Sequence, residues 1–213
     1  MFARAYDLLM ADVDYEAIYL WLKPYLKENS TIIDAGCGSG YLLLELLKNK
    51  HQAIGVDNDT EMLSLALNRL QENELNPMLY EHDLRESIGV QVDIVLAMFD
   101  VVNYFKGVKQ VFKNIYQALN KDGVFIFDIY KEEVFELYDN YTEIDDQPIH
   151  YEWQVKTKEQ QLFHTVKIGN ELEKIKQYVY PISYYKSILE NLGFQVEVKD
   201  GIDTRKHYVI AYK

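Results

Sequence analysis

Three carboxylates in this 213-residue chain each stand at or near the end of a short strand-like segment, and the first of them precedes a run of glycines. Asp34 ends the segment 31–33 and precedes three glycines at alternate positions, Gly36, Gly38 and Gly40. Glycine is needed where the backbone takes unusual dihedral angles, or where a ligand must approach the main chain. The segment 41–47 then has the spacing of a helix. A strand, a glycine turn and a helix start in this order predict a nucleotide-binding crevice at the carboxyl end of a parallel strand.

The spacing of the glycines argues against a dinucleotide site. The fingerprint G-x-G-x-x-G requires a small residue at its third fixed position. Counted from Gly36 that position is Tyr41, and counted from Gly38 it is Leu43. A carboxylate just before the turn would also repel a pyrophosphate, whereas it suits a ligand that carries a positive charge. These two features make an NAD-linked oxidoreductase a weak candidate for the function of this chain.

The segment from Asp34 to Gly40 fits the motif D-x-G-x-G-x-G at every fixed position, and in this the chain resembles the class I S-adenosylmethionine-dependent methyltransferases. Asp57 and Asp83 extend the resemblance, because they end or nearly end the strand-like segments 53–57 and 78–84. A carboxylate after the second strand can accept hydrogen bonds from two ribose hydroxyls. The alternative for each acid is a helix cap or a solvated turn.

The resemblance implies that the chain binds S-adenosyl-L-methionine and releases S-adenosyl-L-homocysteine. It implies that Asp57, with Asn58 beside it, binds the ribose, and that Asp83 and the backbone of Leu84 bind the adenine. The amino terminus is similar to that of small bacterial methyltransferases whose leading helix folds over the methionine end of the cofactor. Tyr6 is then expected there, or it is a packing residue between helix and sheet. The cofactor-binding residues that we expect are Tyr6, Asp34, Gly36, Cys37, Gly38, Gly40, Asp57, Asn58, Asp83, Leu84 and Phe99.

Methyl transfer from a sulfonium makes few demands on catalytic groups. The methyl carbon is already electrophilic, so alignment supplies most of the rate, and a general base is needed only if the acceptor must lose a proton early. The apolar segment 92–99 is followed by Asp100, Asn103 and Tyr104. These three residues are candidates for binding the methionine amino group or positioning the acceptor. The alternative is that Asp100 caps a helix and Asn103 is a buried structural residue. The histidines have no metal-ligand spacing, and we predict no metal site.

The remaining pattern predicts the elements that position these residues. Segments with helical spacing (62–70, 108–119 and 183–194) alternate with strand-like ones (124–130, 195–198 and 207–212). Helical crossovers make the first five strands parallel, and the chain ends on an antiparallel pair. We therefore expect an α/β fold with a Rossmann-like seven-stranded methyltransferase sheet, in a single domain over residues 1–213.

Residues 131–180 depart from a minimal fold of this kind. The segment opens with many acids and then alternates like strands, with Gly169-Asn170 as a possible hairpin turn. We expect three antiparallel strands here, forming an inserted β lid over the active-site edge of the main sheet. The alternative is a peripheral sheet that only extends the core or forms a dimer contact.

Whole-chain properties restrict the partners. The net charge is −12 and no block of Lys and Arg stands out, so a nucleic-acid acceptor is disfavoured. No apolar run has the length of a membrane span, the first residues lack a signal-peptide pattern, and the lone Cys37 cannot form an internal disulfide. We expect a cytoplasmic bacterial enzyme, a monomer or homodimer, that acts on a small molecule or a protein. A catalytically silent S-adenosylmethionine-binding module is the alternative.

Overall fold

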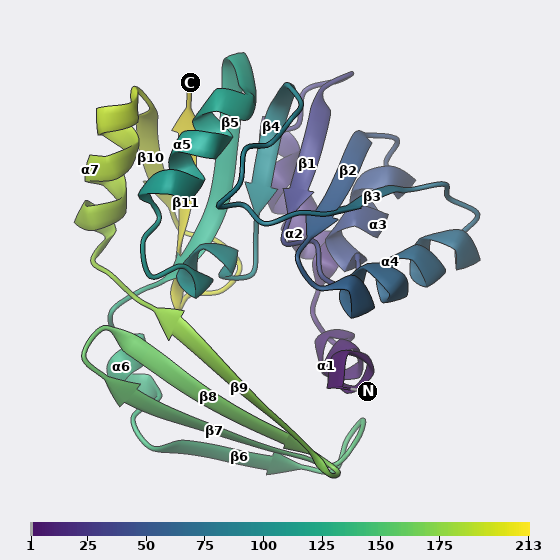
Figure 1. The fold of residues 1–213 in the computed structure, drawn as a ribbon, viewed down its shortest axis with the longest axis vertical. Coiled ribbons are helices and arrows are strands. Elements are labelled where there is room, and N and C mark those ends of the chain that lie inside the picture. Colours follow the sequence, from purple (N-terminus) through teal and green to yellow (C-terminus); the bar gives the residue numbers. More distant parts are fainter. Residues whose placement is uncertain (1) are drawn as a thin grey trace.

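The strands of the protein form two separate sheets, and the smaller sheet lies below the larger one (Figure 1). The computed structural model describes residues 2–213, with the main chain only at residues 2, 4 and 5. The larger sheet has seven strands in the order β10-β11-β5-β4-β1-β2-β3. Strands β1 to β5 pair in parallel, and β11 pairs antiparallel with both β5 and β10. The strands are β1 (Thr31–Ala35), β2 (Gln52–Asp57), β3 (Met78–Glu81), β4 (Val92–Ala97), β5 (Leu119–Tyr130), β10 (Gln195–Lys199) and β11 (Lys206–Tyr212). This is the seven-stranded methyltransferase sheet that the sequence predicts.

Helices cover both faces of this sheet, so its central strands are apolar on both sides. Ile94 and Leu96 of β4 pack into one layer. Val95 and Ala97 of the same strand pack into the other. The helices are α1 (Phe2–Met10), α2 (Tyr15–Leu22), α3 (Tyr41–Lys48), α4 (Thr60–Glu72), α5 (Lys109–Ala118), α6 (Val134–Leu137) and α7 (Ile182–Leu192), with 3-10 turns η1 (Lys23–Tyr25) and η2 (Val101–Tyr104). Helices α5 and α7 cover one face, and α2 and α3 cover the other.

The smaller sheet is antiparallel, with the order β6-β7-β8-β9, and lies beneath the carboxyl ends of the parallel strands (Figure 1). Its strands are β6 (Tyr141–Asp145), β7 (Tyr151–Lys158), β8 (Gln161–Ile168) and β9 (Glu171–Tyr178). Strand β9 contacts both η2 and α1. The turn between β8 and β9 lies at Gly169-Asn170 as predicted, but the prediction of three strands is wrong. The acidic segment that contains Glu143 and Asp145 forms a fourth strand because it pairs with β7.

Two predicted boundaries also differ. Strand β5 begins at Leu119 and not at residue 124, because Leu119 pairs with Val92 and the ladder continues, with a register shift, to residue 124. Strand β3 ends at Glu81, so Asp83 lies in the turn that follows it. Within residues 2–213, no helix has the length and apolar character needed to cross a membrane.

Candidate active site

The glycine turn after β1 exposes its main chain to a cavity. Gly36 and Gly38 have φ angles of +75° and +52°, in the left-handed region that favours glycine. A Cβ added at Gly36 would lie 2.5 Å from Val101 Cγ2, whereas a Cβ at Gly38 would meet nothing within 4 Å. The main chain at Gly38 therefore borders open space, where a ligand can approach it closely.

Two carboxylates face this turn from the ends of β1 and β2. Asp34 is 3% exposed, and its Oδ2 has no hydrogen-bond partner among the described residues. Burial and the nearby Asp57 raise the pKa of Asp34 from 3.8 to about 7. Asp57 accepts hydrogen bonds from the N–H groups of Gly38 (2.8 Å) and Asp59 (2.9 Å), although burial raises its pKa. A ligand with an ammonium group and vicinal hydroxyls would satisfy both carboxylates.

The turn after β3 supplies the far end of the same cavity. The Asp83 carboxylate accepts a hydrogen bond from Arg85 Nε (3.0 Å), and the side-chain and backbone hydrogen bonds from Arg85 hold the pKa of Asp83 below its usual value. The backbone oxygen of Leu84 accepts a hydrogen bond from the buried Asn114 side chain (3.0 Å), which fixes the turn. His82 lines the cavity beside Asp83, and its Nε2 is buried without a partner among the described residues. The sequence did not mark His82 as a site residue.

The cavity has a volume of about 740 Å³. Most of the expected cofactor-binding residues line it, namely Tyr6, Asp34, Gly36, Cys37, Gly38, Asp57, Asn58, Asp83, Leu84 and Phe99. Gly40 is not part of the lining; a Cβ there would lie 2.9 Å from Ala66 Cβ on α4, so this glycine allows close helix packing. Burial raises the pKa of the Cys37 thiol, and Asp34 and Asp57 add to the effect, so Cys37 is a neutral packing residue.

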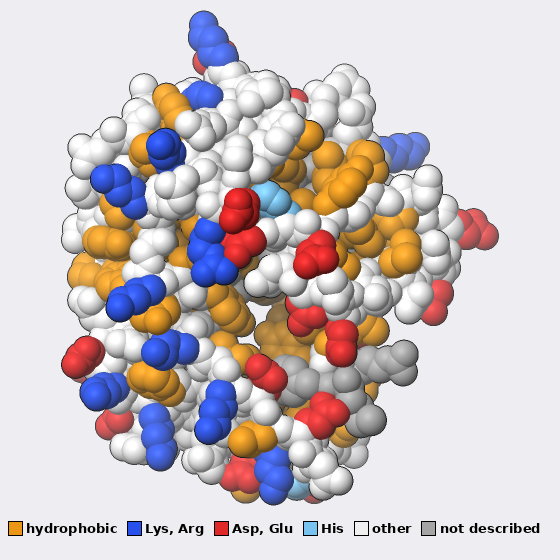
Figure 2. All heavy atoms as spheres, viewed as in Figure 1, with side chains coloured by type: hydrophobic (Ala, Val, Ile, Leu, Met, Phe, Trp, Pro, Cys, Tyr) orange, Lys and Arg blue, Asp and Glu red, His pale blue; other side chains and the backbone are white. Residues whose placement is uncertain are grey.

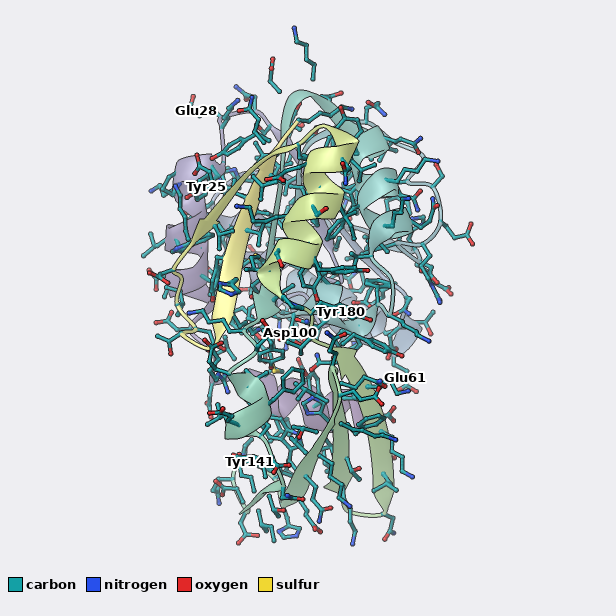
Figure 3. All side chains as sticks on the ribbon, turned by 90° about the vertical axis from the view of Figure 1, so that its left-hand side faces the viewer. Tyr25, Glu28, Glu61, Asp100, Tyr141 and Tyr180 are labelled. Atoms are coloured by element: carbon teal, nitrogen blue, oxygen red, sulfur yellow. The ribbon has the colours of Figure 1, made fainter. Side chains whose placement is uncertain are left out.

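A second cavity, also of about 740 Å³, lies between the two sheets. Figure 2 shows a hollow between the body and the lower sheet, with acidic side chains beside it, and Figure 3 shows Asp100 at the junction of the two sheets. The two cavities share one wall, formed by Tyr6, Met10, Phe99, Tyr104 and Ile175. The two cavities therefore adjoin each other at these five residues.

Of the three catalytic candidates, two line a cavity and one does not. Tyr104 borders both cavities, whereas Asp100 borders only the second. Asn103 is fully buried; its Nδ2 donates to the backbone oxygen of Tyr178 (2.7 Å) and its Oδ1 accepts from the N–H of Tyr130 (3.1 Å). Asn103 therefore joins β9 of the lower sheet to β5 of the upper one.

A buried ionic network forms the floor of the second cavity. The Asp128 carboxylate accepts hydrogen bonds from the N–H groups of Phe99 (3.0 Å) and Asp100, which holds both residues at positive φ (62° and 56°). Lys206 Nζ lies 2.5 Å from Asp100 Oδ1 and 3.6 Å from Asp128 Oδ1. Burial lowers the pKa of Lys206, but the two carboxylates more than offset this, and the pKa is raised overall. Gln177 of β9 donates to the other oxygen of Asp100 (2.5 Å).

The lower sheet contributes two further polar groups to the second cavity. His164 Nδ1 accepts a hydrogen bond from Trp153 Nε1 (3.1 Å), and its Nε2 is buried without a partner among the described residues. Glu143 accepts hydrogen bonds from the hydroxyls of Tyr141 and Tyr151, and its hydrogen bond to Tyr141 raises the pKa of that phenol to about 12. No group of three or more His, Cys, Asp or Glu side chains within residues 2–213 is arranged to hold a metal ion.

Known proteins share both the sequence pattern and this architecture. A family model described as a methyltransferase domain matches residues 26–187. The protein named "Putative methyltransferase YqeM" of Bacillus subtilis is 29% identical over 213 aligned residues, which cover 92% of this chain and 85% of YqeM. The structure of an S-adenosylmethionine-dependent methyltransferase from Clostridium acetobutylicum is 25% identical, with a TM-score of 0.81, and the match covers 99% of this chain and 97% of that one.

The fold also matches a protein solved with the cofactor bound. CalS10 of Micromonospora echinaspora, an amino pentose methyltransferase in complex with S-adenosylmethionine, has a TM-score of 0.75 at 17% identity; the match covers 99% of this chain and 95% of CalS10. The matches favour S-adenosylmethionine over NAD, in agreement with the glycine spacing. The chain therefore belongs to the class I S-adenosylmethionine-dependent methyltransferases.

Proposed function

We propose that this enzyme transfers the methyl group of S-adenosylmethionine to a small molecule held between the two sheets. One observation carries the proposal: the cavity lined by the glycine turn and the cavity under the lower sheet share a wall. A reaction between two bound ligands requires adjoining sites, because methyl transfer depends on alignment at short range.

The residues around the first cavity fit the cofactor. We assign the ribose to Asp57 and the methionine ammonium to Asp34, whose Oδ2 has no partner among the described residues. The adenine belongs beside Leu84 and His82, with Asp83 close by. Arg85 pairs with Asp83 at an exposed site, where an ion pair is worth little, so an adenine amino group can compete for the carboxylate. When bound, the cofactor supplies an electrophilic methyl group on sulfur.

The shared wall assigns roles to Tyr6 and Tyr104. Burial raises the pKa of Tyr6 to about 12, with Asp100 adding to the effect, and burial also raises the pKa of Tyr104. Both phenols therefore keep their protons at neutral pH and cannot act as general bases. We propose that they orient the acceptor and the sulfonium across the wall, while Asn103 is a positioning residue that holds β9 to β5.

We propose that residues 131–180 are a lid inserted in one domain that spans residues 1–213. Side chains of the lower sheet line the second cavity, including Tyr151, His164 and Gln177. The sheet also has its own apolar cluster, which includes Val155 and Leu162. Replacing 131–180 with a short loop should leave cofactor binding largely intact, apart from the contribution of Ile175 to the shared wall, and abolish turnover. A variant that folds and still methylates would contradict the assignment.

A cavity between the two sheets with an acidic lining favours a small molecule over a nucleic acid, and we propose a small molecule over a protein side chain as well. The test is to incubate the enzyme with S-adenosylmethionine labelled on its methyl group and a bacterial extract separated into small-molecule and macromolecular fractions. We expect enzyme-dependent label in the small-molecule fraction. Label confined to protein would refute the acceptor class, and binding without any transfer would favour the silent module. The single buried cysteine accords with a cytoplasmic bacterial enzyme.

A further inference from the structure

The second cavity carries an excess of negative charge. Among the described residues that line it, six are carboxylates and two, Arg205 and Lys206, are cations, so their formal excess is four negative charges. The carboxylates are those of Asp12, Asp100, Asp128, Glu143, Asp145 and Asp203. An excess of this kind concentrates cations and repels anions.

The paired groups neutralise only part of this charge. Arg205 Nη2 lies 2.8 Å from Asp203 Oδ2, which balances one carboxylate. Lys206 is shared between Asp100 and Asp128, whose side chains are 14% and 4% exposed. Burial raises the pKa of Asp128, with Lys206 opposing the shift and Asp100 adding to it, because one cation does not balance two carboxylates in this trio. A cation bound beside the trio would stabilise the ionised form of Asp128.

Glu143 places a further negative charge on the lower sheet. Its two partners, the hydroxyls of Tyr141 and Tyr151, are neutral donors. They orient the carboxylate but do not cancel its charge. Aromatic rings from Tyr6, Tyr104, Tyr130, Tyr138 and Trp153 form much of the remaining lining. Such faces attract cations; Lys206 Nζ already lies 5.1 Å from the ring centroid of Tyr130.

His164 is an independent sign that a ligand binds in this cavity. Its side chain is 94% buried (6% exposed), and its Nε2 has no partner among the described residues. An indole N–H can only donate, so the hydrogen bond from Trp153 makes Nδ1 the acceptor. Burial lowers the pKa of His164, while Asp100 and the side chain of Gln177 act in the opposite direction; the ring is neutral, with its one proton on Nε2 beside Gln177. His164 therefore offers an N–H donor, which suits an oxygen atom of a ligand.

We infer that the methyl acceptor is a small amine that also carries an oxygen atom able to accept a hydrogen bond, an inference that rests on the proposed function. The ammonium form binds between the Asp100–Lys206–Asp128 trio and Glu143, and the oxygen accepts from His164 Nε2. One proton must leave the ammonium before reaction and passes to solvent. The nitrogen lone pair then forms the bond to the methyl carbon, the electron pair of the carbon–sulfur bond stays on sulfur, and the product nitrogen carries the positive charge.

Charge selectivity can be tested by ligand binding alone, with choline and dimethylbutanol as probes. The two molecules have the same shape and the same hydroxyl, but in dimethylbutanol a neutral carbon replaces the charged nitrogen. Trp21→Phe leaves Trp153, in the wall of the cavity, as the one fluorescent indole of the chain. With Trp153 fluorescence as the signal, we expect choline to bind the S-adenosylhomocysteine complex about tenfold more tightly than its isostere 3,3-dimethylbutan-1-ol.

Three further variants in the Trp21→Phe background separate the contributions. Glu143→Gln should reduce the preference for choline severalfold, whereas Glu152→Gln, on the same sheet but outside the cavity lining, should not change it. His164→Phe should weaken both probes by the same factor, because both carry the hydroxyl. A His164→Phe protein that binds both probes normally would refute the oxygen contact.

Equal binding of the two probes, or no response to either, would overturn the amine inference. Binding of S-adenosylhomocysteine is measured in the same samples by calorimetry, so these outcomes leave the proposed function standing. Failure of S-adenosylhomocysteine to bind would count against the proposed function itself.

Discussion

Asp34 should destabilise the ligand-free protein and tighten cofactor binding, and Asp34→Asn separates the two effects. The Asp34 carboxylate is 3% exposed, and its Oδ2 has no hydrogen-bond partner among the described residues. Burial is the main reason that its pKa rises from 3.8 to about 7, with Asp57 adding to the shift. The amide of asparagine has nearly the same shape and carries no charge to desolvate.

The sign and size of the stability effect follow from proton linkage. Because the folded-state pKa of Asp34 lies above its unfolded value, the folded protein holds a proton that the unfolded chain has lost. The free energy of unfolding should therefore fall as the pH rises from about 4 to about 7, by about 2–4 kcal/mol for this one group. Asp34→Asn removes that contribution, so the ligand-free variant should be the more stable protein above about pH 7.

Cofactor binding should respond in the opposite direction. An ammonium group paired with the Asp34 carboxylate is worth about 1.5–3 kcal/mol as a charged hydrogen bond. Asp34→Asn should therefore bind S-adenosylhomocysteine about 10- to 150-fold more weakly. In wild type, the affinity should also fall as the pH drops below about 7, because protonation of Asp34 competes with the ammonium.

The assay is urea unfolding at about pH 5 and about pH 8, with and without S-adenosylhomocysteine, combined with calorimetry. Glu81→Gln is the matched control, since Glu81 is an exposed carboxylate at the end of β3. A ligand-free Asp34→Asn protein that is less stable than wild type at the higher pH would refute the stability argument. An unchanged affinity for S-adenosylhomocysteine would refute the assignment of the ammonium to Asp34.

Three further variants test other contacts. Asp57→Ala should weaken S-adenosylmethionine binding by about 1–3 kcal/mol in calorimetry, because it leaves buried donors unpaired; unchanged binding would remove Asp57 from the ribose site. Arg69 Nη2 contacts both carboxylate oxygens of Asp7 (2.9 and 3.0 Å) and so ties α1 to α4 beside the cofactor cavity. Asp7→Asn should speed S-adenosylhomocysteine release severalfold in stopped-flow measurements, and an unaltered rate would mean that α1 does not gate the cavity. Lys206→Met leaves two buried carboxylates without their cation, so the free energy of unfolding should fall by about 3–5 kcal/mol near neutral pH. A variant as stable as wild type in urea would contradict the claim that Lys206 stabilises the buried carboxylates of Asp100 and Asp128.

The sequence predicts the cofactor side of the site well because its signals are local. Asp34 and the glycines lie within seven residues of chain, and Asp57 directly ends an apolar run. Parallel pairing then brings the ends of β1 and β2 together without further information. The pairing of Asp83 with Arg85 was missed although it is equally local, since the two residues are only two positions apart.

The acceptor side was not predictable in the same way, because distant residues create it. Lys206 and Asp100 are 106 positions apart and meet only because β11 pairs with β5. Asp128 did leave a signal, as the one acid in the otherwise apolar segment 124–130. His164 and Glu143 lie in alternating polar strands, where a buried polar residue looks like a solvated one, and the same ambiguity concealed β6.

The structure of the enzyme with S-adenosylhomocysteine bound tests the central claim most directly. We predict the ribose hydroxyls on Asp57, the amino group within hydrogen-bond distance of Asp34, and the sulfur at the wall formed by Tyr6, Phe99 and Tyr104, facing the second cavity. A sulfur atom directed to bulk solvent, or separated from the second cavity by protein, would contradict methyl transfer to a molecule held between the two sheets.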